Sequence, residues 1–362
     1  MQAALSLARR GLGRVWPNPA VGCVLVDPKG DRVVGRGWTQ PGGRPHAETE
    51  ALARAGQAAR GATAFISLEP CNHQGQTPPC SEALVSAGIK RVVIAVADPD
   101  PRVSGSGIAR LKDAGISVTT GICDAAATDI NAGFFKRIND GRPLITLKTA
   151  TSLDARIATA KGESKWITGE TALAFGHRLR AEQDAIVIGI GTALADDPQL
   201  TCRLPGMAGH SPLRIVLDSR LRLSPASFLA QSAADVPTWI VAAAGQTYEH
   251  ADDDYVKCGA SVIEAPADDL GRPDVAWLAQ EFGRRGLTRV MIEAGSALSA
   301  SWLRANLVDR LAWFRAPKLL GGDGIAVTDA LGIDNLSDAP VFTRMNLVLA
   351  GNDAIETYRR MD

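Results

Sequence analysis

The chain has 362 residues, of which 46% are hydrophobic; this is more than one ordinary domain needs, so we expect two globular domains. No apolar run approaches the roughly 20 residues that span a bilayer, which argues against a membrane protein. The first ten residues place their charges after the apolar stretch, the reverse of a secretory signal peptide, so we expect a cytoplasmic location. The six cysteines are too scattered for a disulfide framework.

The formal net charge is zero, but the two halves of the chain differ in charge. Residues 1–142 carry 17 Lys and Arg against 12 Asp and Glu, whereas residues 143–362 carry the remaining 22 and 27. A net charge of +5 on the first half suits a small anionic substrate, and it falls short of the dense basic patch of a nucleic-acid binder. The sign changes near the turn-forming stretch 138–143. We therefore predict two domains, 1–142 and 143–362.

In chain order, the first domain alternates predicted strands and helices. A helix over 2–13 is followed by the rigid turn Trp16-Pro17-Asn18-Pro19, whose exposed amide either binds a substrate edge or only forms the turn. The remaining predicted elements are a hairpin of strands 20–26 and 32–38, helix 47–59, strand 64–68, helix 79–87, strand 91–97, helix 107–114, strand 116–120 and helix 125–137. Strands that alternate with helices favour parallel pairing in a three-layer α/β/α sandwich.

The candidate chemistry of this domain lies in two short segments. His46 and Glu48 stand at the start of one predicted helix, and Cys71 and Cys80 flank the approach to the next. One imidazole and two thiols supply three protein ligands for zinc and leave a fourth tetrahedral position for water. His-x-Glu followed by Pro-Cys and a second cysteine is the arrangement of a zinc-dependent hydrolytic deaminase, with Glu48 as the proton carrier. A structural zinc site with His73 as fourth ligand is the alternative, and it would leave Glu48 without a role.

The spacing of the two cysteines narrows this prediction, because eight residues separate them where the general deaminase pattern has two. Asn-Pro-x-Val-Gly-Cys at 18–23, Pro-His-Ala-Glu at 45–48 and Glu-Pro-Cys-Asn-His-x-Gly-x-Thr-Pro-Pro-Cys at 69–80 resemble the bifunctional riboflavin-biosynthesis deaminase/reductase family. Residues 98–107 match as well, although Asp100 stands where many members have asparagine. The resemblance implies a cytidine-deaminase-like domain and a substrate contact at Asn18.

The second domain also alternates predicted strands and helices: strand 144–150, helix 170–181, strand 185–189, strand 215–218, strand 289–293, helix 297–306 and closing strands 342–349 and 354–358. Gly189-x-Gly191 lacks the third glycine of a dinucleotide fingerprint, because Leu194 occupies that position. The junction at Gly295-Ser296 can bind a pyrophosphate through backbone N–H groups, but such junctions are more often structural. From its residues alone, this half is an α/β domain with two candidate anion loops.

The family resemblance continues through this half and implies a dihydrofolate-reductase-like fold that binds NADPH. It implies cofactor contacts at Ala150, Trp166, Thr192, Asp196, Ser219, Gly295 and Ser296. It implies contacts to the phosphoribosylaminopyrimidine at Ser164, Arg180, Leu200, Arg203 and Glu293; the two arginines can bind phosphate through charge-assisted hydrogen bonds. Lys148 is either an electrostatic contributor or a strand-edge residue. Arg214 and Arg220 flank the strand 215–218; each faces either a phosphate or solvent, and we expect solvent for both.

These features predict a bifunctional enzyme with one Zn²⁺ per chain and NADPH. From the resemblance, we expect it to deaminate 2,5-diamino-6-(5-phosphoribosylamino)pyrimidin-4(3H)-one and then to reduce the ribosyl chain of the product to ribityl. The expected partners are this small phosphorylated pyrimidine and, from the family, a second copy in a homodimer; neither nucleic acid nor a membrane is expected. The rivals are a nucleoside or tRNA deaminase fused to a nucleotide-binding domain, and a non-catalytic zinc-bearing binding protein.

Overall fold

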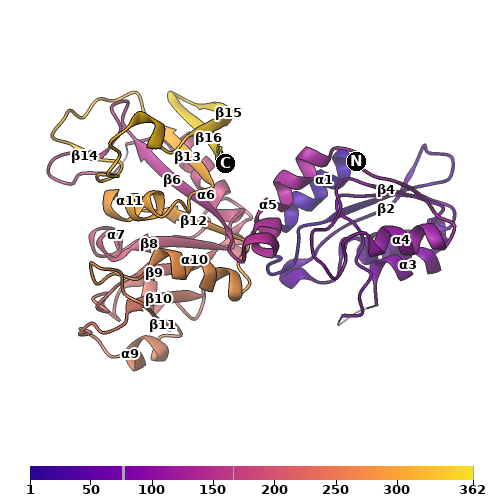
Figure 1. Cartoon of the computed structure of the whole chain (residues 1–362), viewed down its shortest axis with the longest axis horizontal. Coiled ribbons are helices and arrows are strands. Elements are labelled where there is room, and N and C mark those ends of the chain that lie inside the picture. The colour runs from indigo at the N-terminus through magenta and orange to yellow at the C-terminus, as the bar shows by residue number, and fades with distance from the viewer. Residues whose placement is uncertain (76–77, 166, 362) are drawn as a thin grey trace. The chain divides into compact units, whose positions relative to one another are not determined.

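The structure is a computed structural model that describes residues 1–75, 78–165 and 167–361 (Figure 1). It divides into two compact units, Met1–Gly141 and Arg142–Asp362. Each unit has its own main β-sheet and its own buried apolar clusters. Among the residues described, none of the helices combines the length and the apolar character that crossing a membrane requires.

The first unit is a five-stranded sheet in the order β2-β1-β3-β4-β5. The predicted parallel pairing holds for β3, β4 and β5. In contrast, β1 runs antiparallel to both of its neighbours, β2 and β3. These two strands run in the same direction, and the chain passes from β2 to β3 through α2. The elements are α1 (Gln2–Ala8), β1 (Gly22–Val26), β2 (Val33–Trp38), α2 (Ala47–Ala55), β3 (Thr63–Ile66), α3 (Cys80–Ser86), β4 (Arg91–Ile94), α4 (Ser106–Asp113), β5 (Ser117–Thr119) and α5 (Asp124–Asp140).

Helices cover both faces of this sheet, which gives the predicted three layers. The apolar cluster on one face includes residues of α2, α3 and α4, and the cluster on the other includes residues of α1 and α5. Two glycines allow the helices to lie close to the strands. A Cβ on Gly22 would lie 1.9 Å from the carbonyl oxygen of Ala4 in α1, and a Cβ on Gly37 would lie 2.1 Å from that of Ala47 in α2. Gly37 therefore positions the first turn of α2.

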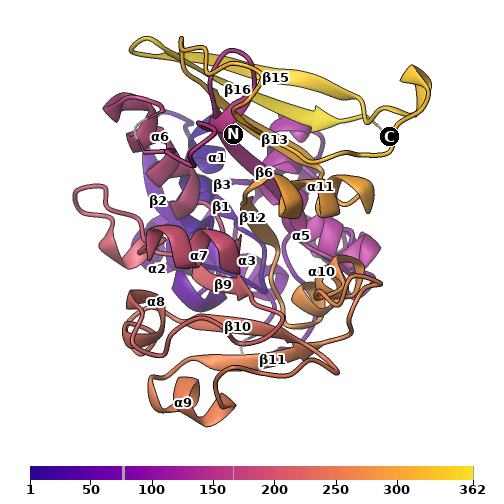
Figure 2. The same ribbon diagram turned by 90° about the vertical axis from the view of Figure 1, so that its left-hand side faces the viewer.

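The second unit contains a nine-stranded sheet in the order β11-β10-β9-β8-β12-β6-β13-β16-β15, which Figure 2 shows from the bottom to the top of the view. The strands from β11 to β13 are all parallel, and β16 and β15 are antiparallel additions at one edge. The strands are β6 (Leu144–Thr151), β7 (Arg156–Ala158), β8 (Ala185–Gly189), β9 (Leu213–Leu217), β10 (Thr238–Ala243), β11 (Ser261–Ala265), β12 (Arg289–Glu293), β13 (Arg310–Arg315), β14 (Ile325–Ala326), β15 (Phe342–Ala350) and β16 (Asp353–Arg360). The helices are α6 (Glu170–Ala181), α7 (Ile190–Asp196), α8 (Phe228–Gln231), α9 (Asp252–Lys257), α10 (Val275–Arg284) and α11 (Ser296–Arg304).

The order of the parallel strands creates a crevice. After β8 the chain adds β9, β10 and β11 on one side, and it then returns to place β12 on the other side of β8. The connections that leave β8 and β12 therefore diverge, and α7 and α11 begin directly beyond the carboxyl ends of these two strands. Ligands of open α/β sheets bind at such a point of reversal, outside the carboxyl ends of the strands.

The prediction that Arg214 faces solvent was wrong. Its side chain is fully buried in β9, and its guanidinium group donates to the Thr238 and Ser232 hydroxyls and to the carbonyl oxygens of Gln199, Leu229, Ser232 and Val236. Burial lowers the pKa of Arg214 to about 10, so the group is still charged at neutral pH. The ring of acceptors replaces the water that the buried charge loses. Arg220, in contrast, is exposed as expected.

Candidate active sites

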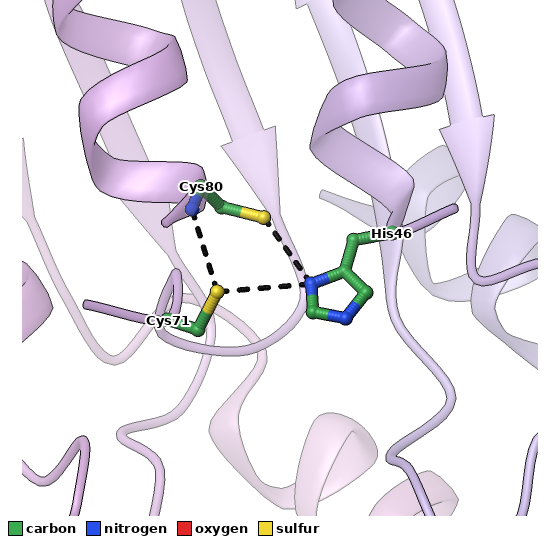
Figure 3. Close-up of side chains that lie close together, drawn as sticks. All are labelled: His46, Cys71 and Cys80. Atoms are coloured by element: carbon green, nitrogen blue, oxygen red, sulfur yellow. Dashed lines mark hydrogen bonds between the residues drawn. The ribbon is translucent and has the colours of Figure 1, made fainter. Parts of the chain in front are cut away.

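His46, Cys71 and Cys80 come together where α2 and α3 begin (Figure 3). Their ligand atoms all lie within 4.8 Å of one another. His46 Nδ1 is 3.3 Å from Cys80 Sγ and 3.7 Å from Cys71 Sγ, and the Cys80 N–H donates to Cys71 Sγ at 3.4 Å. Tetrahedral zinc, with bonds of about 2.0–2.3 Å, separates its ligand atoms by about 3.5–3.8 Å. The donor set and its spacing therefore fit a zinc ion.

The alternative of a fourth protein ligand finds no support in this geometry. His73 does not belong to the group of ligand atoms that the described residues bring together. Its Nδ1 is buried and has no hydrogen-bond partner within the described part of the chain. The three-ligand arrangement leaves one tetrahedral position for water or substrate, as in catalytic zinc sites.

The protonation of the three side chains also suits a cation. A hydrogen bond from Cys80 lowers the pKa of the Cys71 thiol to about 4, and the hydrogen bond with Cys71 raises the pKa of His46. The hydrogen bond between Cys71 and Cys80 and, as the second cause, burial raise the pKa of Cys80. Cys71 is thus a thiolate at neutral pH, and the binding of a divalent cation favours the deprotonated form of the Cys80 thiol as well.

Glu48 lies in the first turn of α2 beside these ligands, and only 3% of the residue is exposed. Burial, and then the negative charge of Cys71, raises the pKa of Glu48 to about 7. Both protonation states are therefore populated at neutral pH. A carboxyl group with this pKa can accept a proton in one step of a reaction and return it in another.

The loop that carries Cys71 is held by contacts that the sequence prediction missed. The buried carboxylate of Glu69 accepts hydrogen bonds from three backbone N–H groups of residues 98–108, at 3.1 to 3.3 Å. Gly107 in α4 lets the loop approach, since a Cβ there would lie 2.0 Å from the carbonyl oxygen of Pro70. A glutamate just after a buried strand requires several hydrogen-bond donors, and this requirement is the sequence feature from which the role of Glu69 could have been predicted.

Asn18, the predicted substrate contact, lies beside the segment that leads into His46. A Cβ on Gly43 would lie 1.8 Å from Asn18 Nδ2, so the amide fits only against a glycine, and Gly43 has a φ of +83°. Asp100 is already paired, because Arg102 donates to its carboxylate through Nε and Nη2. The hydrogen bonds from Arg102 hold the pKa of Asp100 below its ordinary value.

A cavity of ≈ 910 Å³ opens at the crevice of the second unit. This volume suits a cofactor-sized ligand. Ala150, a predicted NADPH contact, lies in β6 and packs beside an apolar cluster that includes Phe314; it is not among the lining residues. Trp166 lies outside the described residues. The other predicted NADPH contacts line the cavity: Thr192, Asp196, Ser219, Gly295 and Ser296. The predicted substrate contact Ser164 lines it too.

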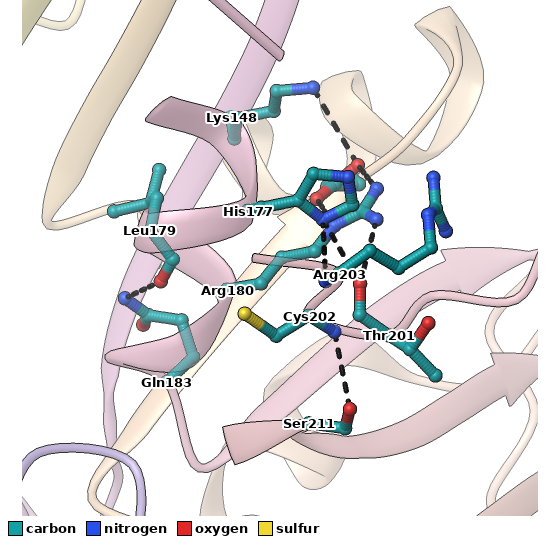
Figure 4. Close-up of polar contacts among 10 residues, drawn as sticks. Lys148, His177, Leu179, Arg180, Gln183, Thr201, Cys202, Arg203 and Ser211 are labelled. Atoms are coloured by element: carbon teal, nitrogen blue, oxygen red, sulfur yellow. Dashed lines mark hydrogen bonds and ion pairs between the residues drawn. The ribbon is translucent and has the colours of Figure 1, made fainter. Parts of the chain in front are cut away.

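A smaller cavity of ≈ 350 Å³ shares Asp196 with the larger one and is lined by three predicted substrate contacts, Arg180, Leu200 and Arg203. The segment that carries the last two is held by α6, because His177 Nδ1 lies 3.1 Å from the carbonyl oxygen of Thr201 (Figure 4). Leu200 is buried with a φ of +55°, an uncommon conformation for a residue other than glycine.

Glu293, the fifth predicted substrate contact, joins Arg180 in a two-pronged ion pair. Arg180 Nε and Nη2 donate to the two carboxylate oxygens at 2.8 and 2.9 Å, and Lys148 Nζ lies 3.6 Å from Oε2. Burial by itself would raise the pKa of Glu293, but the positive charges of Arg180 and Lys148 outweigh it and hold the pKa well below its ordinary value. The carboxylate is therefore ionised, and Lys148 faces a charged network.

Comparisons with known proteins agree with this geometry. Residues 1–96 match the cytidine and deoxycytidylate deaminase zinc-binding region, and residues 143–354 match the RibD C-terminal domain. The riboflavin biosynthesis protein RibD of Escherichia coli is 40% identical over 364 residues, which cover 98% of this chain and 96% of that protein. The chain belongs to the RibD family of bifunctional deaminase/reductases. The RibD of Haemophilus influenzae is 39% identical, and the match covers 99% of this chain and 96% of that protein.

Solved structures of relatives share the whole fold. A RibD structure from Acinetobacter baumannii has a TM-score of 0.87 and 37% identity, and the match covers 100% of this chain and 98% of that one. The Thermotoga maritima diaminohydroxyphosphoribosylaminopyrimidine deaminase/5-amino-6-(5-phosphoribosylamino)uracil reductase has a TM-score of 0.85 and 31% identity, with coverage of 100% and 97%. The predicted family, the bifunctional assignment and the fold class are confirmed: a cytidine-deaminase-like α/β domain followed by a dihydrofolate-reductase-like one.

Proposed function

We propose that residues 1–142 deaminate 2,5-diamino-6-(5-phosphoribosylamino)pyrimidin-4(3H)-one, and that residues 143–362 use NADPH to reduce the ribosyl chain of the product to ribityl. The observation that carries the proposal is the group of His46, Cys71 and Cys80 with the buried Glu48 beside it, in a chain of the RibD family. When bound there, zinc supplies a Lewis acid that lowers the pKa of water at its open position.

Glu48 moves the protons of the deamination. It accepts a proton from the water that attacks the amino-bearing ring carbon and passes it to the adjacent ring nitrogen; it then transfers the proton of the added hydroxyl to the departing amino group, so ammonia leaves and a carbonyl remains. Asn18, beside the segment that leads to His46, is the proposed contact to the substrate.

In the second unit, the chain orients two ligands, while the hydride chemistry belongs to the cofactor. The backbone at the start of α11, Gly295 and Ser296, is the proposed pyrophosphate contact, since N–H groups at a helix start favour anions. Arg180 and Arg203 on the wall of the smaller cavity are the proposed contacts to the substrate phosphate. The ionised Glu293 can accept a hydrogen bond from a ribose hydroxyl. Ala150 and Trp166 remain proposed NADPH contacts by family resemblance.

Two assays on the purified full chain test this proposal. Ammonia release is measured with the diaminopyrimidine, and with cytidine and tRNA as competing substrates. NADPH oxidation is then followed by absorbance with the deaminated product. We expect turnover of the diaminopyrimidine alone in the first assay and NADPH oxidation in the second. Release from cytidine or tRNA instead would favour the rival deaminase, and an absence of NADPH oxidation would remove the second activity.

We also propose a homodimer that forms through the second unit. The outermost strand, β15, has apolar side chains at alternate positions that stay exposed, Leu347 (47%) and Leu349 (76%); Met345 (42%) is exposed beside them, at an irregularity of the pairing with β16. Alternate residues of a strand share one face, and a second copy can cover this one. Light scattering should give twice the mass of the chain, and Leu349→Asp should lower the measured mass to that of one chain.

A cytoplasmic location is proposed as well, because a reducing compartment preserves the free thiols of Cys71 and Cys80.

A further inference from the structure

The segment 199–203 lines the smaller cavity of the second unit and contains neither a helix nor a strand. Two predicted substrate contacts, Leu200 and Arg203, belong to it. The φ of +55° at Leu200 is a conformation that a leucine keeps only where its surroundings hold it. The position of this wall therefore depends on contacts from outside the segment.

Side chains of other parts of the fold supply these contacts, and two of them come from the stretch 211–214. Arg214 Nη1 donates to the carbonyl oxygen of Gln199 at 3.4 Å. The Cys202 N–H group donates to the Ser211 hydroxyl at 3.2 Å. The peptide groups between these two points are bonded from the opposite direction in the sequence, by α6.

His177 of α6 contacts two backbone groups of the segment (Figure 4). Its Nδ1 lies 3.1 Å from the carbonyl oxygen of Thr201 and 3.4 Å from the backbone nitrogen of Arg203. The tautomer with hydrogen on Nδ1 donates to the carbonyl group, and the other tautomer accepts from the N–H group. In both neutral tautomers, Nδ1 thus bonds to the backbone between Thr201 and Arg203.

Arg203 depends on this backbone more than Arg180 does. Arg180 lies in a helix, and the carboxylate of Glu293 fixes its guanidinium group. The Arg203 side chain is exposed, and within the described part of the chain its guanidinium group has no hydrogen-bond or ion-pair partner. The backbone at Arg203 therefore decides where this side chain can reach. A shift of the segment would displace the donors of Arg203 and leave those of Arg180 in place.

His177 adds no charge of its own to this wall at neutral pH. Burial, followed by the positive charges of Arg180 and Arg203, lowers the pKa of His177 below its ordinary value, so the ring is neutral at pH 7. The residue does not line the smaller cavity either. Its contribution to an anionic ligand must therefore pass through the segment that it holds.

We propose that His177 is a positioning residue for the reduction: its Nδ1 fixes the backbone between Thr201 and Arg203, so that Arg203 can bind the substrate phosphate. This inference rests on the proposed function, because it assumes that the smaller cavity receives the phosphorylated substrate. A guanidinium fork binds a phosphate well only in a fitting orientation. A displaced Arg203 would keep its charge and lose these hydrogen bonds.

The test is NADPH oxidation with the deaminated product, on three variants of the full chain. His177→Asn places an amide group near the position of Nδ1, His177→Gln places it one bond further out, and His177→Leu removes the polar group. For His177→Leu, we expect the KM for the deaminated product to rise about tenfold, the loss of one hydrogen bond. The kcat and the KM for NADPH should stay close to their wild-type values. His177→Asn should restore most of the KM, and His177→Gln should not.

A double variant tests whether His177 acts through Arg203. In the background of Arg203→Gln, His177→Leu should raise the KM for the deaminated product no further, because the group that it positions is gone. Arg178→Gln is the matched control on the same helix, since Arg178 is exposed and pairs with Glu182. It should change neither KM.

Three results would overturn the inference and leave the reductase assignment standing. They are an unchanged KM for the deaminated product in His177→Leu, equal KM values in His177→Asn and His177→Gln, and additive effects in the double variant. A purely structural role would instead lower the melting temperature and raise the KM for NADPH in parallel, and this outcome would overturn it as well. If His177→Leu does not fold, the comparison of His177→Asn with His177→Gln decides. A wild-type protein that does not oxidise NADPH would overturn the proposed reductase itself, and the inference with it.

Discussion

The two units build their sites in different ways. In the first unit, the three candidate zinc ligands and one carboxyl group come from two short segments that lead into neighbouring helices. In the second unit, the cavity wall is assembled from the connections after several strands, and the ion pair between Arg180 and Glu293 joins residues that are 113 positions apart. One site is local in the sequence, and the other is a product of topology.

This difference follows from what each site must supply. A metal ion requires a few atoms of particular elements at fixed distances, so only a narrow set of residues and spacings is possible. A dinucleotide requires a long cavity, backbone N–H groups and a few charges, and many sequences can provide them once strands and helices are in place. Replacing a single ligand atom should therefore abolish the site of the first unit, whereas the site of the second unit depends on a network of interacting residues.

The largest effect is expected when a zinc ligand is removed. Cys71→Ser should lower bound zinc from about one per chain towards none and abolish deamination, whereas oxidation of NADPH with the deaminated product should persist, because the second unit has its own core. Metal analysis and the two assays measure this. Cys123→Ser, at an exposed cysteine outside the ligand group, is the control. Loss of both activities in Cys71→Ser would break the separation of the two units.

The second unit should respond most strongly in its stability. Glu293→Gln leaves the largely covered side chains of Arg180 and Lys148, 16% and 18% exposed, without a counter-charge, which costs about 3–5 kcal/mol. Urea unfolding of the second unit at pH 7 measures it. Glu182→Gln, in an exposed i,i+4 pair with Arg178, is the control and should stay within about 0.5 kcal/mol.

The pH dependence of the same variant gives a second check. The folded-state pKa of Glu293 lies below its unfolded value of 4.5, so its carboxylate stabilises the fold above that pH, and the contribution is lost as the pH falls below 4.5 towards the folded pKa. The stability gap between wild type and Glu293→Gln should therefore be full at pH 7 and smaller at pH 3. A gap of equal size at both pH values would contradict the ion-pair account.

The smallest effect concerns how the zinc site is positioned. Gly37→Ala places a Cβ against the carbonyl oxygen of Ala47, and overpacking of this kind costs about 1–3 kcal/mol. The start of α2 must shift, so deamination should fall while NADPH oxidation does not. Gly176→Ala in α6 is the matched control, because a Cβ there meets nothing within 4 Å. Equal effects of the two substitutions on deamination would show that Gly37 does not position α2.

The first site could be predicted because its residues act through local spacing. His46, Cys71 and Cys80 keep their meaning without knowledge of the fold, and the starts of α2 and α3 follow from local sequence signals. The antiparallel pairing of β1 with β2 was predicted as a hairpin, but its antiparallel pairing with β3 could not be predicted, since strand order depends on contacts between distant segments. The expectation for Arg214 was wrong because it placed this residue just before the strand, whereas Arg214 belongs to β9, and only the folded chain shows the hydroxyl and carbonyl groups around its guanidinium group.

The cavity of the second unit lies between these cases. Gly295 and Ser296 were candidates because a strand, a glycine and a helix start follow one another in the sequence. Arg222 and Arg272, which also line it, carried no signal, since each stands in a polar connection where an arginine normally faces water. They share one wall only because β9 and β11 end on the same side of the crevice.

The central claim is that Glu48 moves the protons of a zinc-dependent deamination, independently of the second unit. Glu48→Gln tests it most directly, with Glu50→Gln, whose carboxylate pairs with Arg54 on the same helix, as the control. We predict that Glu48→Gln keeps its zinc and its NADPH oxidation, while kcat for deamination falls by about 10²–10⁴-fold. An unchanged rate of ammonia release, with zinc still bound, would contradict the account.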